Sequence, residues 1–430
     1  MANGHPTRVA SIGRRWLLVL CALVALLAGT SHAQTTDDFF NPAAVQRIDL
    51  LVNSQDWAKL QENFQENTYY PADMRWNGLT VRNVGIRSRG LGSRSAAKPG
   101  LRVDFDRYAS DQTFLGLKSF VLDNLTQDPS GVKESVTMRF YARMGVPAPR
   151  ESFTRLYVNN QLVGLYGVVE AVDKDLLARV FGEIDGNVQN DGYLFEYNYI
   201  VGSPWRFEYL GSDLAAYAER FDAKTKESRS DAEKWGPIEE LVRVTNDTPA
   251  AALPAALEAR LDLPALVRYL AAQNFVAEPD GFTGYDGMNN FYFYRVEDGT
   301  RHVCIAWDED NAFETPDFPL TLRHDENVLV RKLLASSAWR SQYFATLNEA
   351  AVSAAQVDEG QAEGWLLAEM RRQLDLIAAP MREDTSKPYS NEEHAAAREA
   401  LLAFPTARIT YVTCEAARAT GAPLPEGCPQ

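Results

Sequence analysis

The sequence predicts an α+β protein with a β-rich N-terminal lobe and an α-rich C-terminal lobe. Short apolar runs separated by turn residues dominate the first part of the chain, which is typical of antiparallel sheet. Longer stretches with apolar residues at helical spacing fill most of the second half. One strand-like pair interrupts that helical half, so the lobes are expected to be mixed rather than purely β and purely α. The expected boundaries are 34–175 for the first lobe, 176–405 for the second lobe and 406–430 for a C-terminal tail.

The first lobe begins with strand-like runs and then alternates between helix and strand. A helix is expected at 130–144, because Ser130 can cap it, apolar residues recur every four positions, and Gly145 stops it. The runs 154–158 and 162–170 are separated by Asn-Asn-Gln, which predicts a β-hairpin. A second helix is expected from Asp173 to about Phe181. The expected single strands are 47–53, 78–85, 101–105, 117–122 and 193–197.

The second half is predicted to be mostly helical. The helix expected at 231–244 contains Gly236-Pro237, a dipeptide that kinks or restarts a helix. The helix expected at 263–275 has Asp262 as its cap and a proline in its first turn. The runs 291–295 and 303–307 predict a second β-hairpin. We expect further helices to fill much of 327–420.

The composition excludes several classes of protein. The chain has 430 residues and a formal net charge of −15, so a broad basic surface for nucleic acid is not expected. There is no HExxH, so a zinc peptidase is disfavoured. There is no CxxC and no GxSxG, which argues against zinc ribbons, thioredoxin-like sites and serine hydrolases.

The N-terminal segment 1–33 is predicted to be a signal peptide. Three arginines precede the apolar run 16–29, which is too short for a comfortable membrane span. Ser31-His32-Ala33 then offers a small-residue cleavage site. We therefore expect an exported protein, by the Sec or the twin-arginine route, with no transmembrane segment in the mature chain.

Export places the remaining cysteines in an oxidising compartment. Cys414 and Cys428 are spaced so that they could close a small loop near the C-terminus, and a free pair remains the alternative. Cys304 lies in an apolar stretch and is expected to be a buried thiol.

Acids and amides crowd the open end of the second hairpin. Asn290 stands at its entrance, Asp308 and Asp310 follow its exit, and Asp280 precedes it. Because the entrance and exit of a hairpin lie close together, Asn290 and Asp308 could share one ion. Oxygen ligands of this kind suit Mg²⁺ or Ca²⁺, and a free aspartate beside them could act as a base. The alternative is a polar loop without a ligand, since Asp and Asn also favour turns.

A basic stretch and one glutamate are further candidates. Arg87, Arg89 and Lys98 belong to a small-residue, basic segment inside an acidic protein, and such a segment can hold phosphate oxygens. It contains no GxGxxG or GxxxxGK, so a solvated hairpin loop is an equal alternative. Glu170 ends a strand. It could form an ion pair with a lysine or arginine across a cleft, or it could simply be exposed to solvent. The carboxylates Glu278 and Asp280 lie too close in sequence to flank a sugar bond as a glycosidase pair.

Three stretches together resemble the CotH kinase family, the spore-coat-protein-H-like atypical kinases. They are SRGLGSRSAAKPGLRVDF at 88–105, DPSGVKESVTMRFYARMGVPAPRESFTRLYVNNQLVGLYGVVEAVDKDLL at 128–177, and PDGFTGYDGMNNFYFYR leading into AWDEDNAF. The resemblance covers about residues 45–320. It implies a two-lobed, kinase-like fold that uses ATP and Mg²⁺ or Mn²⁺ to phosphorylate a protein substrate, here one in the envelope or secreted.

The resemblance also implies roles for the candidate residues. Asp280 would orient the acceptor hydroxyl, and Asp308 would be the principal metal ligand, with Asn290 as an accessory ligand. Arg87, Arg89 and Lys98 would contact phosphate. Asp310 would support the metal site, and Glu170 would lie near the nucleotide base. The family's Leu-Tyr-Lys pattern is absent, because 193–197 reads YLFEY. A non-catalytic surface or assembly protein therefore stays open as an alternative, as does a secreted carbohydrate-active enzyme.

Overall fold

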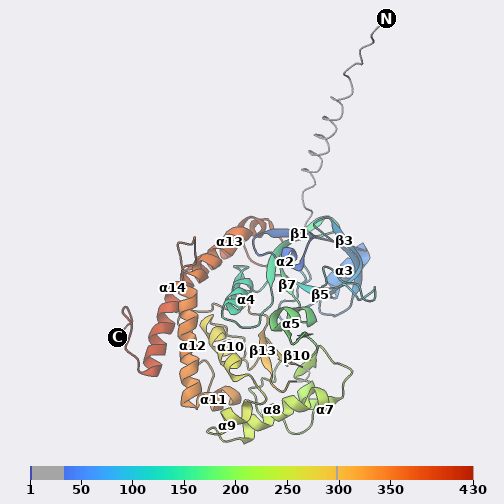
Figure 1. Ribbon diagram of the computed structural model, residues 1–430. Coiled ribbons are helices and arrows are strands. Elements are labelled where there is room, and N and C mark those ends of the chain that lie inside the picture. Colours follow the sequence, from blue (N-terminus) through green and yellow to red (C-terminus); the bar gives the residue numbers. More distant parts are fainter. Residues whose placement is uncertain (2–32, 297–298, 430) are drawn as a thin grey trace. The chain divides into compact units, whose positions relative to one another are not determined.

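The computed structural model describes residues 1, 33–296 and 299–429. The predicted signal peptide lies, except for its two end residues, outside the described residues. The chain divides into two units, Met1–Phe39 and Phe40–Gln430. The described part of the first unit contains helix α2 (Thr36–Phe39). The second unit contains the sheets and the other described helices (Figure 1).

Seven strands of the second unit close into a barrel with the order β1-β2-β3-β4-β5-β7-β6. Neighbouring strands pair antiparallel, as the sequence predicts, except that β1 pairs parallel with β6 and places Ile48 opposite Leu156. That closing pair was not predicted, because the two strands lie about a hundred residues apart. Alternate residues such as Leu50 and Val103 are fully buried inside the barrel. The strands are β1 (Val45–Val52), β2 (Tyr70–Trp76), β3 (Leu79–Ser88), β4 (Leu101–Asp104), β5 (Ser119–Asp123), β6 (Glu151–Val158) and β7 (Gln161–Glu170).

Three helices accompany the barrel in sequence: α3 (Ser54–Glu62), α4 (Lys133–Arg143) and α5 (Lys174–Phe181). The sequence predicted α4 and α5, but not α3. Helix α4 ends before Gly145, whose φ of 72° is the left-handed value that favours glycine. Most of α4 is buried, including the carboxylate-bearing Glu134, so this helix faces the interior on more than its apolar stripe.

A second, four-stranded sheet has the order β11-β10-β12-β13. The predicted hairpin is confirmed, since β12 (Phe291–Arg295) pairs antiparallel with β13 (Val303–Ala306) and Phe291 lies opposite Ala306. Strand β10 (Tyr193–Tyr197) was predicted, and β11 (Phe221–Ala223) was not. A separate two-stranded sheet consists of β8 (Glu183–Ile184) and β9 (Asn187–Val188).

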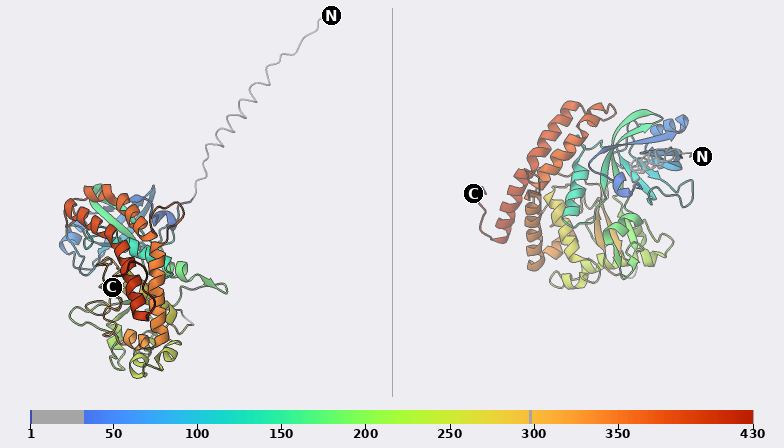
Figure 2. Two further views of the ribbon diagram at one scale, coloured as in Figure 1. Left: turned by 90° about the vertical axis from the view of Figure 1, so that its left-hand side faces the viewer. Right: turned by 45° about the horizontal axis from the view of Figure 1, so that its top comes forward.

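Helices supply the rest of the second unit. The predicted interruption near Pro237 is observed as a break at Trp235 between two helices. The long helices α12 and α14 pack side by side, and α10 packs on α12 (Figures 1 and 2). Helix α14 runs through residue 406, where the C-terminal tail was expected to begin. The helices are α6 (Ala215–Ala218), α7 (Asp231–Lys234), α8 (Gly236–Asp247), α9 (Leu253–Leu257), α10 (Leu263–Phe275), α11 (Val328–Leu334), α12 (Ser337–Ala355), α13 (Trp365–Glu383) and α14 (Asn391–Thr420).

The cysteines behave as the oxidising alternative predicts. Cys414 on α14 forms a disulfide with Cys428, and Cys304 on β13 is a buried free thiol. The bond fixes the end of the chain to its last helix. A search of the described helices finds none that is long and apolar enough to cross a membrane.

Candidate active site

An open groove of about 1180 Å³ is lined by residues of the barrel and of the second sheet. It brings together the two segments that the sequence singled out, namely the basic stretch after β3 and the acidic end of the β12–β13 hairpin. Charged side chains of both signs line it, namely four basic side chains and seven carboxylates. The basic residues are Arg87, Arg89, Arg94 and Lys224, and the acidic residues are Glu196, Glu219, Asp222, Asp280, Asp286, Asp308 and Asp310.

Asn290 and Asp308 both line this groove. This agrees with the prediction that they lie close together, which is based on their positions at the entrance and the exit of one hairpin. Asn290 directly precedes β12, and Asp308 follows β13 by two residues. Both have left-handed backbone conformations, with φ of 57° and 55°. Asn and Asp tolerate this region better than other side chains, and such conformations often occur at functional sites. The chain therefore turns sharply at both residues as it enters and leaves the sheet.

Asp280 lies in the same groove and is held by two amides. The Nδ2 groups of Asn289 and Asn290 each donate to Asp280 Oδ2 at 3.2 Å. The backbone N–H of Asp280 donates to Glu278 Oε1 at 2.8 Å, which fixes the loop from below. Burial raises the pKa of Asp280, and the two amide donors oppose that rise. The aspartate is thus oriented by neutral donors rather than by a cation.

Arg89 and Asp308 form the centre of the groove. The guanidinium of Arg89 lies 3.6 Å from Asp123 Oδ2 and 3.9 Å from Asp308 Oδ2, over the ring of Trp307. Burial raises the pKa of Asp308 to about 6, against the opposing effect of Arg89. The nearby carboxylates that add to this rise are Asp123, Asp280 and Glu196. The long contacts leave the donors of Arg89 available to a stronger acceptor.

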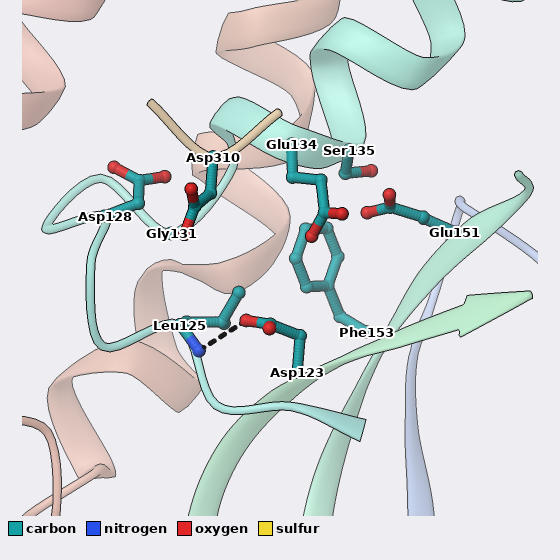
Figure 3. Close-up of a pocket in the computed structure, with 9 residues that line it drawn as sticks. All are labelled: Asp123, Leu125, Asp128, Gly131, Glu134, Ser135, Glu151, Phe153 and Asp310. Atoms are coloured by element: carbon teal, nitrogen blue, oxygen red, sulfur yellow. Dashed lines mark hydrogen bonds between the residues drawn. The ribbon is translucent and has the colours of Figure 1, made fainter. Parts of the chain in front are cut away.

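Asp310 lines both the groove and a small cavity beside it (Figure 3). This cavity of about 10 Å³ has roughly the space that the centre of one water molecule needs. In Figure 3 the side chains of Glu134 and Glu151 point toward one another across it. Burial, and then the neighbouring carboxylates, raise the pKa of Asp310 well above its usual value. The acidic residues of the cavity are Asp123, Asp128, Glu134, Glu151 and Asp310.

The remaining predicted phosphate contacts differ in their placement. Arg87 lines the groove, and its guanidinium donates to Asn67 Oδ1 at 3.1 Å and to the carbonyl of Ser88 at 2.9 Å. Lys98 is fully buried, and its Nζ lies 2.7 Å from Asp384 Oδ2. Burial lowers the pKa of Lys98, and Asp384 opposes this. Lys98 is therefore separated from the groove lining and joins the barrel to the end of α13.

Glu170 also lies away from the groove lining. Its carboxylate, about 1% exposed, accepts from Arg150 at 2.7 Å and from Arg179 at 2.5 Å. Arg179 is on α5, so this cluster joins the end of β7 to the helix that follows it. The structure therefore places Asp280, Asn290, Asp308, Asp310, Arg87 and Arg89 on one groove, and places Lys98 and Glu170 in separate ion pairs.

The sequence reasoning missed several charged residues of this region. Asp123 is the last residue of the buried strand β5 and contacts Arg89. Its position at a strand end, close to an apolar run, is a signal in the sequence that could have identified it. Glu196 and Lys224 lie on and after neighbouring strands, and Lys224 Nζ is 2.5 Å from Glu196 Oε2. The pair could not be predicted because strand β11, which brings Lys224 beside β10, was not predicted. Glu196 lies in the YLFEY stretch, whose lack of a lysine gives no indication of this ion pair.

Arg408 on α14 fixes the segments on either side of the groove carboxylates. It is fully buried, and its guanidinium donates to backbone carbonyls of Asn274 and Phe275 at the end of α10. It also donates to the carbonyls of Pro316 and Phe318, which follow the Asp308–Asp310 segment. One arginine thus bridges the chain before Asp280 and the chain after Asp310.

The groove offers donors that fit a divalent cation bound together with phosphate. Across residues 1, 33–296 and 299–429, no group of three or more His, Cys, Asp or Glu side chains is arranged to hold a metal. Asp308 and Asn290 at the hairpin end nevertheless provide carboxylate and amide oxygens. Mg²⁺ commonly uses one or two protein carboxylates and completes its shell with water and substrate phosphate. The donor set suits that mode better than a closed protein site.

Comparison with known proteins identifies relatives of this chain. The family model described as CotH kinase protein matches residues 86–358. Inner spore coat protein H of Bacillus subtilis (strain 168) is 24% identical over 315 residues, which is 70% of this chain and 80% of that protein. Among solved structures, the Helicobacter pylori proinflammatory kinase CtkA matches 75% of this chain and 95% of that chain, with 10% identity and a TM-score of 0.29.

Proposed function

The chain belongs to the CotH kinase protein family, and we propose that it is an exported atypical protein kinase. It would transfer the γ-phosphate of ATP to a protein hydroxyl with Mg²⁺ or Mn²⁺. The observation that carries the proposal is the groove in which Asp280, Asn290 and Asp308 lie beside Arg89. Phosphoryl transfer depends mainly on positioning and on neutralising phosphate charge, and this groove provides an oriented base, a guanidinium and hard oxygen donors.

Asp280 is the residue suited to the acceptor hydroxyl. Its Oδ2 is held by Asn289 and Asn290, whereas its Oδ1 accepts no hydrogen bond from the described part of the chain. Oδ1 can therefore accept the hydroxyl of a serine, threonine or tyrosine. In the transfer, the acceptor oxygen bonds to the γ-phosphorus, the bond to the ADP oxygen breaks, and the hydroxyl proton passes to Asp280.

Arg89 is suited to the phosphate chain. Its guanidinium is shared between Asp123 and Asp308 at 3.6 and 3.9 Å, distances that a phosphate oxygen can improve on. When bound, a divalent cation would offset the charge of the phosphates, with Asp308 and Asn290 as its protein donors and Asp310 beside them. This cation is expected to be essential, because the groove carries more carboxylates than basic side chains before ATP enters.

Two observations support action outside the cytoplasm on a protein of the envelope or on a secreted protein. The Cys414–Cys428 disulfide is typical of oxidising compartments. The N-terminal sequence has the pattern of a signal peptide. Separately, the relative inner spore coat protein H is by its name a protein of the spore coat. We expect the acceptor to be a structural protein of a coat or envelope.

A transfer assay with γ-labelled ATP, Mg²⁺ and candidate envelope proteins tests the proposal. Wild-type protein should label its acceptor, and chelation of the metal should abolish labelling. Asp308→Asn should abolish labelling as well, and Asp280→Asn should slow it by about 100- to 1000-fold with little change in ATP affinity. The matched control is Asp317→Asn, a carboxylate that follows the site but does not line the groove.

Three outcomes would contradict the proposal or its assignment of residues. Labelling that persists in Asp308→Asn would remove Asp308 from the site. ATP binding by the wild-type protein without transfer to any acceptor would indicate a non-catalytic assembly protein. Hydrolysis of a glycan in the absence of nucleotide would indicate a carbohydrate-active enzyme instead.

A further inference from the structure

The four basic side chains of the groove are held in different ways. The guanidinium of Arg94 donates to the backbone carbonyls of Phe64, Glu66 and Gly90, so it braces the loop in which it lies. Arg87 is bonded to the same region of the chain. Arg94 therefore uses most of its donors on the protein, whereas both hydrogen bonds of Arg87 come from Nη1 alone. Arg89 and Lys224 differ from both, because their side chains face carboxylates of the groove rather than carbonyls of their own loop.

Lys224 comes from a part of the chain far from the arginines. It directly follows β11, and its backbone N–H donates to the carbonyl of Leu194 at 2.8 Å, which continues the pairing with β10. Its Nζ lies 2.5 Å from Glu196 Oε2 and 2.8 Å from Asp222 Oδ2. An ammonium has three N–H donors, so two carboxylate contacts leave one for a ligand. The side chain is 32% exposed, and it lines the groove.

Glu196 connects Lys224 to the centre of the groove. In the sheet it lies opposite Tyr292, two residues after Asn290. Its charge is among those that raise the pKa of Asp308, after burial as the main cause, so the two carboxylates are electrostatic neighbours. Lys224 is therefore ion-paired with a carboxylate that interacts electrostatically with Asp308, the aspartate that we assign to the metal.

We propose that Lys224, held in place by Glu196 and Asp222, is a phosphate-binding residue of the groove. It binds the polyphosphate chain of the nucleotide and acts together with Arg89, which reaches the groove from the barrel. This inference rests on the proposed function, because it assumes that a nucleoside triphosphate occupies the groove. The two carboxylates keep the lysine charged and extended, so little side-chain freedom is lost when a phosphate oxygen joins them.

The chain provides a matched control two residues away. Lys226 also forms an ion pair, with Asp191 Oδ2 at 2.9 Å, but it does not line the groove. Lys224→Gln and Lys226→Gln therefore remove the same charge from the same turn. A conservative variant, Lys224→Arg, keeps the charge and should keep most of the binding.

Calorimetric titration of the full mature protein with ATP and with adenosine, each with Mg²⁺, tests the proposal. Lys224→Gln should bind ATP about 10- to 100-fold more weakly than wild type, which corresponds to the loss of one charged hydrogen bond. Its affinity for adenosine should be unchanged, and Lys226→Gln should match wild type for both ligands.

The outcomes separate this inference from the proposed function. If wild type binds ATP and transfers phosphate while Lys224→Gln has unchanged ATP affinity, only the role of Lys224 is overturned. An equal loss of ATP and adenosine binding in Lys224→Gln would also overturn it, because the effect would not be specific for phosphate. A wild-type protein that binds no ATP would overturn both.

Discussion

Arg89 and Lys98 stand nine residues apart in the same basic stretch, yet the fold uses them in opposite ways. Arg89 lies in the groove with two carboxylates at 3.6 and 3.9 Å. Lys98 is fully buried, and its Nζ lies 2.7 Å from the carboxylate of Asp384. The short contact compensates for the removal of a charge from water, whereas the long contacts of Arg89 leave hydrogen-bonding capacity for a ligand.

The same contrast separates the acidic candidates. Glu170 is saturated by two arginines and is about 1% exposed. Asp308 is 37% exposed at its side chain, and its ion pair within the described part of the chain is the long contact of 3.9 Å with Arg89. Charged side chains that are fully paired within the protein are expected to contribute to its stability. Charged side chains that are only partly paired are expected to contribute to ligand binding. Variants of the two groups therefore should differ in which property they change.

The largest effect on stability is expected from Lys98→Met. This variant leaves the buried Asp384 carboxylate without its counter-charge, although three backbone N–H groups still donate to it. It should lower the free energy of unfolding by about 3 kcal/mol. Urea unfolding followed by circular dichroism measures the loss. Asp308→Asn serves as the control from the groove and should not be destabilised. If Lys98→Met instead kept its stability and lost ATP affinity, the contrast drawn above would fail and Lys98 would be a phosphate contact.

A smaller loss is expected from Glu170→Gln. The glutamine keeps the shape and one acceptor but removes the charge between Arg150 and Arg179, which should cost about 2 kcal/mol. Thermal unfolding with and without ATP and Mg²⁺ measures both consequences together. The melting temperature should fall, and the increase caused by the nucleotide should equal that of wild type. A reduced nucleotide effect would assign Glu170 to the binding site after all.

The smallest effect is expected from the titration of Asp308. Burial raises its pKa from 3.8 to about 6, so the folded protein favours the protonated form. Its contribution to stability is therefore present in full below pH 4 and is lost as the pH rises through 6. Asp308→Asn should be about 1 kcal/mol more stable than wild type at pH 7.5, a value reduced for the exposure of the side chain. At pH 4 the two proteins should be alike; an equal difference at both pH values would contradict the raised pKa.

Local sequence patterns predicted many of the helices and strands, but they could not predict which distant strands pair. The hairpin 291–307 could be predicted because two continuous apolar runs and a turn sequence lie within seventeen residues, and the pairing of β12 with β13 confirms it. The parallel closure of the barrel by β1 and β6 joins strands that share no turn, so no local signal announces it. The short strand β11 carries too few residues for a periodic pattern.

The candidate site divides in the same way. The sequence identified residue types and short spacings, which were enough to gather Asp280, Asn290 and Asp308 at one hairpin end. It could not identify partners, and the partner of Lys98 comes 286 residues later in the chain. Since a basic residue in a glycine-rich stretch looks the same whether it meets phosphate or a buried aspartate, Arg89 and Lys98 were given the same role.

Arg408 also has a consequence for the order in which the protein is made. It lies 133 residues after Phe275, whose carbonyl it binds. Ribosomes add about 5–20 residues per second, so this interval corresponds to roughly 7–27 s of synthesis. The segment bearing Asp280 exists for nearly all of that time, and the segment bearing Asp310 for its later part, without the side chain that bridges them. The contacts of Arg408 therefore form only after the last helix has been synthesised, and an unfinished chain carries the groove carboxylates without this support.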